Sequence, residues 1–224
     1  MSFDERLGKA LTNEAMGKLD DALKSYEALA VEFPKEKAVY SRLGMIYFRK
    51  GELKKSIEYY KKALVLCEQD PACPYDLALS YYRAGKIEDA VEYFKKSVEQ
   101  DENYMMGIYW LGITSYHLGK LQDARKYYNK VLELNSDFQI CHYHLGVINN
   151  RLGKYKEAIE HFKAFLEVDK DCATAWSQLG ANYYEAGDLD KAVDAYSRAV
   201  KLQPDDEGAK KNLKLLMELQ EKFS

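Results

Sequence analysis

A fixed period of 34 residues is the feature that most constrains what this chain can fold into. Counted through the 224-residue sequence, six glycines stand 34 residues apart without an insertion or deletion: Gly17, Gly51, Gly85, Gly119, Gly153 and Gly187. A small residue precedes each glycine and an aromatic residue follows it at constant distances, as Gly44 and Tyr60 do around Gly51. A period of roughly 20–50 residues is typical of stacked supersecondary units, so the chain is predicted to be a repeat array.

The period divides the chain into six repeats and a tail. The repeats cover residues 3–36, 37–70, 71–104, 105–138, 139–172 and 173–206, and the tail covers 207–224. Within a repeat, positions 4, 7, 8 and 11 form one apolar helical face, and positions 17, 20, 21, 24, 27 and 28 form a second. The glycine at position 15 is predicted to end the first helix, because glycine adopts a left-handed conformation without steric cost. Each repeat is therefore expected to be a helical hairpin.

These positions resemble the tetratricopeptide repeat. The sixth repeat carries the pattern most fully, with Trp176, Leu179, Gly180, Tyr183, Ala192, Tyr196, Ala199 and Pro204. The resemblance covers residues 3–206 and implies an all-α fold: a single right-handed superhelical solenoid of antiparallel helix hairpins. It also implies that the first helix of each repeat lines a concave wall.

The two ends of the array depart from the pattern. Polar side chains interrupt the apolar face of the first repeat, so its first helix is expected to fray or to cap the array. The tail has a helical stripe and is predicted to be a C-terminal capping helix, which a solenoid needs to cover its last repeat. The members of that stripe are Leu213, Leu216, Met217 and Gln220.

A second face of the first helices is the predicted binding surface. Positions 2, 5, 9 and 12 point about 140° away from the hairpin face and should be polar unless something covers them. In the central repeats they are aromatic or aliphatic, and positions 6 and 13 add a tryptophan and a ladder of cations. The candidate partner-binding residues are Met45, Phe48, Arg49, Tyr75, Leu79, Tyr82, Arg83, Met106, Tyr109, Trp110, Ile113, Tyr116, His117, Tyr143, Val147 and Arg151.

Two interpretations of this face stand side by side. Tyrosine and tryptophan are common at binding hot spots, which favours a peptide groove centred on the fourth repeat. The same rings would equally fill the seams between neighbouring first helices. The ladder of Arg49, Arg83, His117 and Arg151 favours an acidic partner segment, or else each arginine pairs with an acidic residue of the adjacent repeat.

The function predicted from the sequence is a non-enzymatic scaffold or adaptor that binds a peptide or helix of a partner protein. The alternatives are a self-associating, homo-oligomeric platform and a recruiting subunit of a larger enzyme complex. The carboxylate clamp by which similar co-chaperones hold chaperone tails needs lysine at position 5. The central repeats have Tyr75, Tyr109 and Tyr143 there, so that binding mode is not expected.

No cofactor, metal or catalytic site is predicted. The sequence has no glycine-rich phosphate loop and no nucleophile elbow. Cys141, His142 and His144 spread over about 200° of a helix and do not converge on one ion. The four cysteines form no Cys-x-x-Cys pair, and we expect reduced thiols.

Charge and the N-terminal residues limit the remaining classes. Thirty-three basic residues against 36 acidic ones give a net charge of −3, which disfavours nucleic-acid binding. The N-terminal residues are acidic, with no apolar run behind them, so we expect a cytoplasmic protein without a membrane-inserted segment.

Overall fold

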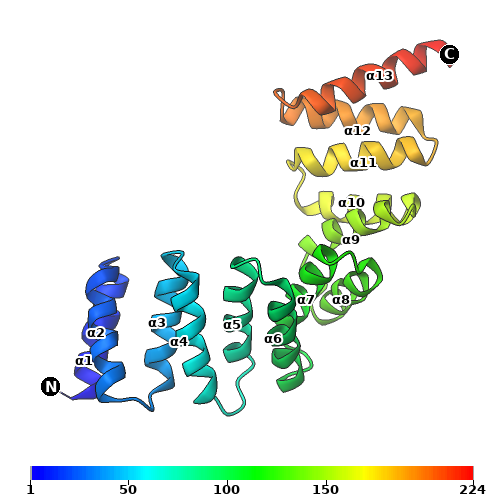
Figure 1. The fold of residues 1–224 in the computed structure, drawn as a ribbon. Helices are drawn as coiled ribbons and strands as arrows, with labels where there is room; N and C mark the ends of the chain where they lie inside the picture. Colours follow the sequence, from blue (N-terminus) through cyan, green and yellow to red (C-terminus); the bar gives the residue numbers. More distant parts are fainter. Residues whose placement is uncertain (1, 224) are drawn as a thin grey trace. The chain divides into compact units, whose positions relative to one another are not determined.

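The computed structural model describes residues 2–223, and every regular element within them is an α-helix (Figure 1). The predicted all-α fold of helical hairpins is therefore confirmed. By its internal contacts the chain divides into an N-terminal unit that ends at Thr114 and a C-terminal unit that starts at Ser115, and the boundary falls inside one helix.

Helices of the N-terminal unit come in antiparallel pairs joined by short turns (Figure 1). They are α1 (Phe3–Ala15), α2 (Leu19–Glu32), α3 (Lys37–Arg49), α4 (Leu53–Val65), α5 (Ala72–Arg83) and α6 (Ile87–Gln100), followed by α7 (Met105–His117), which contains the boundary. The C-terminal unit continues with α8 (Leu121–Leu134), α9 (Ile140–Arg151), α10 (Tyr155–Val168), α11 (Ala173–Glu185), α12 (Leu189–Leu202) and α13 (Glu207–Phe223).

The periodic glycines form the turns inside the hairpins. All six have a positive φ between 69° and 83°, and no other residue among those described has a positive φ. In the second hairpin the N–H of Gly51 bonds to the carbonyl of Phe48, and the N–H of Glu52 bonds to that of Tyr47. These bonds satisfy carbonyls that the end of α3 leaves free, as the sequence predicts for a left-handed glycine after a helix.

Small residues let the two helices of a hairpin approach closely. A Cβ added to Gly44 would lie 2.8 Å from the ring of Tyr60, and the same contact recurs between Gly146 and Phe162. The hydroxyl of Ser56 donates to the carbonyl of Gly44 at 2.9 Å, which places α4 directly on the backbone of α3. The steric reason expected for small residues at these positions is therefore observed.

Within residues 2–223, the first and the last elements are the helices α1 and α13. Helix α1 begins with a capping box, in which the Ser2 hydroxyl accepts from the Glu5 N–H and the Glu5 carboxylate accepts from the Ser2 N–H. At the other end α13 packs on α12 and buries Ala209 and Leu216. The prediction that Met217 belongs to the packed stripe of the tail is wrong, since this side chain is 48% exposed. The residues of α13 that pack on α12 follow the i, i+4, i+7 series 209, 213 and 216, and Met217 lies outside that series.

None of the helices within residues 2–223 is both long enough and apolar enough to cross a membrane.

Candidate functional site

The sixteen candidate residues lie on the first helices of hairpins two to five, and their exposure follows their chemistry. Every aromatic and aliphatic member is half-buried, whereas Arg49, Arg83, His117 and Arg151 are exposed. Because the two units are separate bodies, the set forms two surfaces. We call them together the first-helix face. Its N-terminal part consists of Met45, Phe48, Arg49, Tyr75, Leu79, Tyr82, Arg83, Met106, Tyr109, Trp110 and Ile113. Its C-terminal part consists of Tyr116, His117, Tyr143, Val147 and Arg151.

Trp110 is an inter-repeat packing residue in the N-terminal unit. Its ring stacks on Phe94 of α6, with centroids 5.8 Å apart and planes 13° apart, and Tyr82 of α5 meets it edge-on at 4.9 Å. Tyr75 also contacts Phe94, at 5.8 Å. Phe94 is fully buried. The seam between neighbouring repeats therefore accounts for Trp110, whereas Tyr75 packs on Phe94 within its own hairpin.

Tyr143 in the C-terminal unit packs within its own hairpin, as Tyr75 does in the N-terminal unit. Its ring lies 5.8 Å from Phe162 and 5.4 Å from Phe165, both on α10. Burial raises the pKa of Tyr143, as it does the pKa of Tyr75. At position 5, Tyr75 and Tyr143 thus pack on the second helix of their own hairpins, which neither interpretation of this face predicted.

Arg83 and Arg151 of the arginine ladder contact aromatic rings, and the alternative that each arginine pairs with an acidic residue of the adjacent repeat is wrong. Arg83 donates from Nη1 to the carbonyl of Phe48 at 2.7 Å, and its guanidinium lies 4.9 Å from the Phe48 ring. The guanidinium of Arg151 lies 5.1 Å from the ring of Tyr116. Among residues 2–223, none of Arg49, Arg83 and Arg151 forms a salt bridge to Asp or Glu. The side chains of Arg83 and Arg151 reach aromatic rings of the preceding repeat, which the periodicity alone did not indicate.

The chemistry of this arrangement suits an extended acidic ligand. A guanidinium on an aromatic face keeps most of its five N–H donors free, and its orientation is fixed by the ring. A carboxylate could then accept two parallel hydrogen bonds from one arginine. Half-buried rings beside the arginines provide apolar contact area at low conformational cost.

A half-buried carboxyl, that of Asp76, lies next to the N-terminal part of the face and was missed by the sequence analysis. Burial first, and then the charge of Asp70, raise the pKa of Asp76 to about 6. Tyr75 and Tyr104 pack edge-on at 5.5 Å nearby, and burial raises the pKa of Tyr104 to about 12. The only sequence signal was an acidic residue at position 6, where the neighbouring repeats have Arg42 and Trp110.

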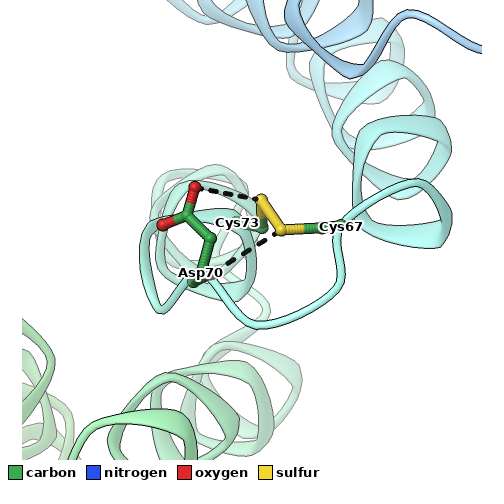
Figure 2. A group of neighbouring side chains, drawn as sticks. All are labelled: Cys67, Asp70 and Cys73. Carbon is green, nitrogen blue, oxygen red and sulfur yellow. Dashed lines mark hydrogen bonds between the residues drawn. A yellow bond between two sulfur atoms is a disulfide. The ribbon is translucent and has the colours of Figure 1, made fainter.

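The expectation of reduced thiols is wrong for two of the four cysteines. Cys67, after α4, and Cys73, in the first turn of α5, are joined by a disulfide (Figure 2). Their Cα atoms are 6.6 Å apart, because the loop between α4 and α5 turns the chain back on itself. The search for a Cys-x-x-Cys motif missed this pair, because the two cysteines are six residues apart in the sequence. Cys141 and Cys172 are free thiols.

Asp70 completes the only group of three potential metal ligands found within residues 2–223. The ligand atoms of Cys67, Asp70 and Cys73 lie within 4.8 Å of one another (Figure 2). The two sulfurs are bonded to each other, so neither is a thiolate, which is the form that binds metals. The carboxylate of Asp70 accepts from Lys37 Nζ at 2.9 Å, which lowers its pKa. All three side chains are therefore already bonded within the chain, the two cysteines to each other and Asp70 to Lys37.

The histidines pair in a way that helical spacing did not reveal. The Nδ1 atoms of His142 on α9 and His161 on α10 are 3.0 Å apart, and burial lowers the pKa of both. His144 stacks on Tyr128 with centroids 4.8 Å apart, and burial lowers its pKa to about 4. His142, His144 and Cys141 share no cluster in the described part of the chain.

Comparison with known families gives one consistent match. Three models, each described as a tetratricopeptide repeat, match residues 6–36, residues 37–103, and residues 75–137 together with 143–207. No curated protein matches the chain by sequence.

Solved structures share the fold. A tetratricopeptide repeat protein from Parabacteroides merdae has a TM-score of 0.74 at 18% identity, over 96% of this chain and 98% of that one. YrrB, described as a TPR protein with an unusual peptide-binding site, has a TM-score of 0.72 at 23% identity, over 82% and 95%. MamA has a TM-score of 0.70 at 24% identity, over 75% and 92%.

Proposed function

Because the chain belongs to the tetratricopeptide repeat family, a generally non-enzymatic protein-interaction fold, we propose that it is a scaffold that binds a partner peptide or helix on the N-terminal or the C-terminal part of the first-helix face, each part by itself. The partner segment carries apolar and acidic residues. Its apolar side chains pack against the half-buried rings, and its carboxylates bind the arginines.

The observation that carries this proposal is the state of the arginine ladder. Arg49 and Arg151 are exposed and have no carboxylate partner among residues 2–223, and the guanidinium of Arg151 lies over the half-buried ring of Tyr116. The described peptide-binding site of YrrB, which has the same fold, supports the same class of function.

A selection from a random peptide library displayed on phage tests the proposal. We expect the wild-type chain to enrich peptides that combine apolar residues with Asp or Glu. The double variant Arg49→Glu, Arg151→Glu should not retain that pool, because the reversed charges repel the acidic residues.

A charge-matched control separates this effect from a general change in net charge. Lys54 on α4 and Lys156 on α10 are exposed and lie on second helices. The variant Lys54→Glu, Lys156→Glu should retain the enriched pool. If neither library enrichment nor a difference between the two double variants is found, the proposed function is wrong.

A further inference from the structure

Stacked tyrosine pairs recur between the two helices of a hairpin. Tyr47 of α3 stacks on Tyr59 of α4, with centroids 5.4 Å apart and planes 1° apart. One period later Tyr81 stacks on Tyr93 at 5.4 Å and 11°. Because the second ring covers the first, Tyr47 and Tyr81 are each only 5% exposed.

The hairpin of α11 and α12 has the first ring of this pair and lacks the second. Tyr183 stands at the position of Tyr47 and Tyr81, and Ala195 stands where Tyr59 and Tyr93 supply the covering ring. Tyr183 is therefore only half-buried. The space left open is part of a cavity of about 410 Å³ lined by α10, α11 and α12. This volume is within the roughly 300–1,000 Å³ that is typical of ligand sites.

The preceding hairpin shows that the chain otherwise fills this space itself. One period before Ala195 stands His161, whose imidazole meets His142 there. Trp176 takes the place of His142 in the last repeat. Its Nε1 donates to the carbonyl of Lys170 at 2.8 Å, which holds the indole at the edge of the cavity. We call this cavity, with its apolar lining of Leu166, Trp176, Leu179, Tyr183 and Ala195, the Tyr183 pocket.

Cations surround the Tyr183 pocket although the whole chain is acidic. Its lining includes Lys163, Lys170, Lys191 and Arg198 against two carboxylates, Glu167 and Asp194. The net charge of the chain is −3. One period earlier, none of the four positions is basic: they are Asn129, Ser136, Glu157 and Ala164. In the hairpin of α3 and α4, which has the covering ring, two of the equivalent positions are basic, Lys55 and Lys62. All four are basic only around the last hairpin, which lacks that ring.

Two of these cations are available to a ligand. Lys163 and Lys191 form salt bridges to Glu160 at 3.5 Å and to Asp188 at 2.6 Å. Within residues 2–223, Lys170 and Arg198 have no such acidic partner. Arg198 lies 4.7 Å from the Trp176 ring, which fixes its guanidinium over the apolar lining.

We propose that the Tyr183 pocket binds one aromatic side chain of an acidic peptide segment. The ring enters the space that Tyr59 and Tyr93 fill in their own hairpins and stacks on Tyr183. Carboxylates on either side of it pair with Lys170 and Arg198. This surface belongs to α10, α11, α12 and the loop between α10 and α11, so the inference does not depend on the first-helix face.

The test is a fluorescence anisotropy titration of the full chain with a labelled seven-residue peptide. The peptide has a central phenylalanine with three acidic residues on each side, and a second peptide has alanine in its place. We expect the phenylalanine peptide to bind at least about tenfold more tightly, because stacked burial of one ring is worth more than 1.4 kcal/mol.

The variant Ala195→Tyr restores the stacked pair of the earlier hairpins and fills the pocket from within. It should weaken binding of the phenylalanine peptide about tenfold or more, without lowering the thermal midpoint, because the same pair packs in α3 and α4. Ala195→Ser leaves the space open and should bind as the wild type does.

A charge variant keeps the test independent of whether Ala195→Tyr folds. Lys170→Glu, Arg198→Glu should also weaken binding about tenfold or more. Failure of the phenylalanine peptide to bind, or equal affinity for the wild type and a charge variant with native circular dichroism, would overturn the proposal. Binding that is lost only in Arg49→Glu, Arg151→Glu would assign the peptide to the first-helix face and reject the Tyr183 pocket.

Discussion

Replacing Gly180 by alanine should destabilise the chain, although alanine favours helices. An added Cβ at this position would lie 2.7 Å from Cδ2 of Tyr196 on α12. The Tyr196 ring is 6% exposed, and its hydroxyl accepts from Asn212 Nδ2 of α13 at 3.1 Å. Because the ring is held on both sides, α11 and α12 must separate to admit the methyl group.

The magnitude follows from two opposing terms. Overpacking of this kind costs about 1–3 kcal/mol. Alanine in place of glycine inside a helix contributes about 1 kcal/mol in the other direction. The net change in the free energy of unfolding should therefore be a loss of about 1 kcal/mol.

Gly8 in α1 provides the matched control, since nothing lies within 4 Å of the Cβ it would gain. In Gly8→Ala only the higher helix propensity of alanine acts, so the free energy of unfolding should rise by about 1 kcal/mol. Urea titrations followed by circular dichroism measure both variants. If Gly180→Ala stabilises as much as Gly8→Ala does, close approach of the paired helices does not limit the residue at this position, and the packing argument fails.

Three further predictions concern protonation and oxidation. Burial lowers the pKa of His144 to about 4, so at acidic pH the unfolded chain binds a proton that the native chain does not. The free energy of unfolding should therefore fall by up to about 3 kcal/mol as the pH drops from about 6.5 to 4. His144→Phe, which keeps a ring on Tyr128, should remove this pH dependence in urea titrations across that range. Burial raises the pKa of Asp76 to about 6, so the native state favours the protonated form; Asp76→Asn should stabilise the chain at pH 8 and change little at pH 4. Alkylation of the unfolded, unreduced chain should leave Cys67 and Cys73 unmodified, and mass spectrometry should find both modified after reduction.

Each of these has a clear contrary result. Parallel pH profiles for the wild type and His144→Phe would show that burial does not shift that histidine. An equal effect of Asp76→Asn at both pH values would show that the charge of Asp76 does not destabilise the native chain. Modification of four cysteines before reduction would show that the disulfide is absent.

The hairpins could be predicted because their determinants are local. The position of Gly51 sets the turn after α3, and the phase of Tyr40, Leu43 and Tyr47 sets the face that packs on α4. Both follow from helix geometry and glycine's conformational freedom. A period repeated without an insertion then extends the same result along the chain.

Contacts between different helices were less predictable. Helical phase indicates the side of the helix on which a side chain lies, but it does not identify the residue that the side chain contacts. Phase places Trp110 away from its own hairpin, and only the structure shows that Phe94 of the preceding repeat receives it. The same holds for Arg83, which reaches the carbonyl of Phe48 and not a carboxylate. The absence of a ring at Ala195 indicates an open space only by comparison with the stacked tyrosine pairs of the earlier hairpins.

The most direct test of the proposed scaffold function is the affinity of one library-selected acidic peptide, measured by isothermal titration calorimetry. Arg49→Glu, Arg151→Glu should bind it about tenfold or more weakly than the wild type, and the loss should shrink at high salt. Lys54→Glu, Lys156→Glu should bind within about twofold of the wild type. Equal affinity of both double variants for the peptide would contradict the assignment of partner binding to the first-helix face.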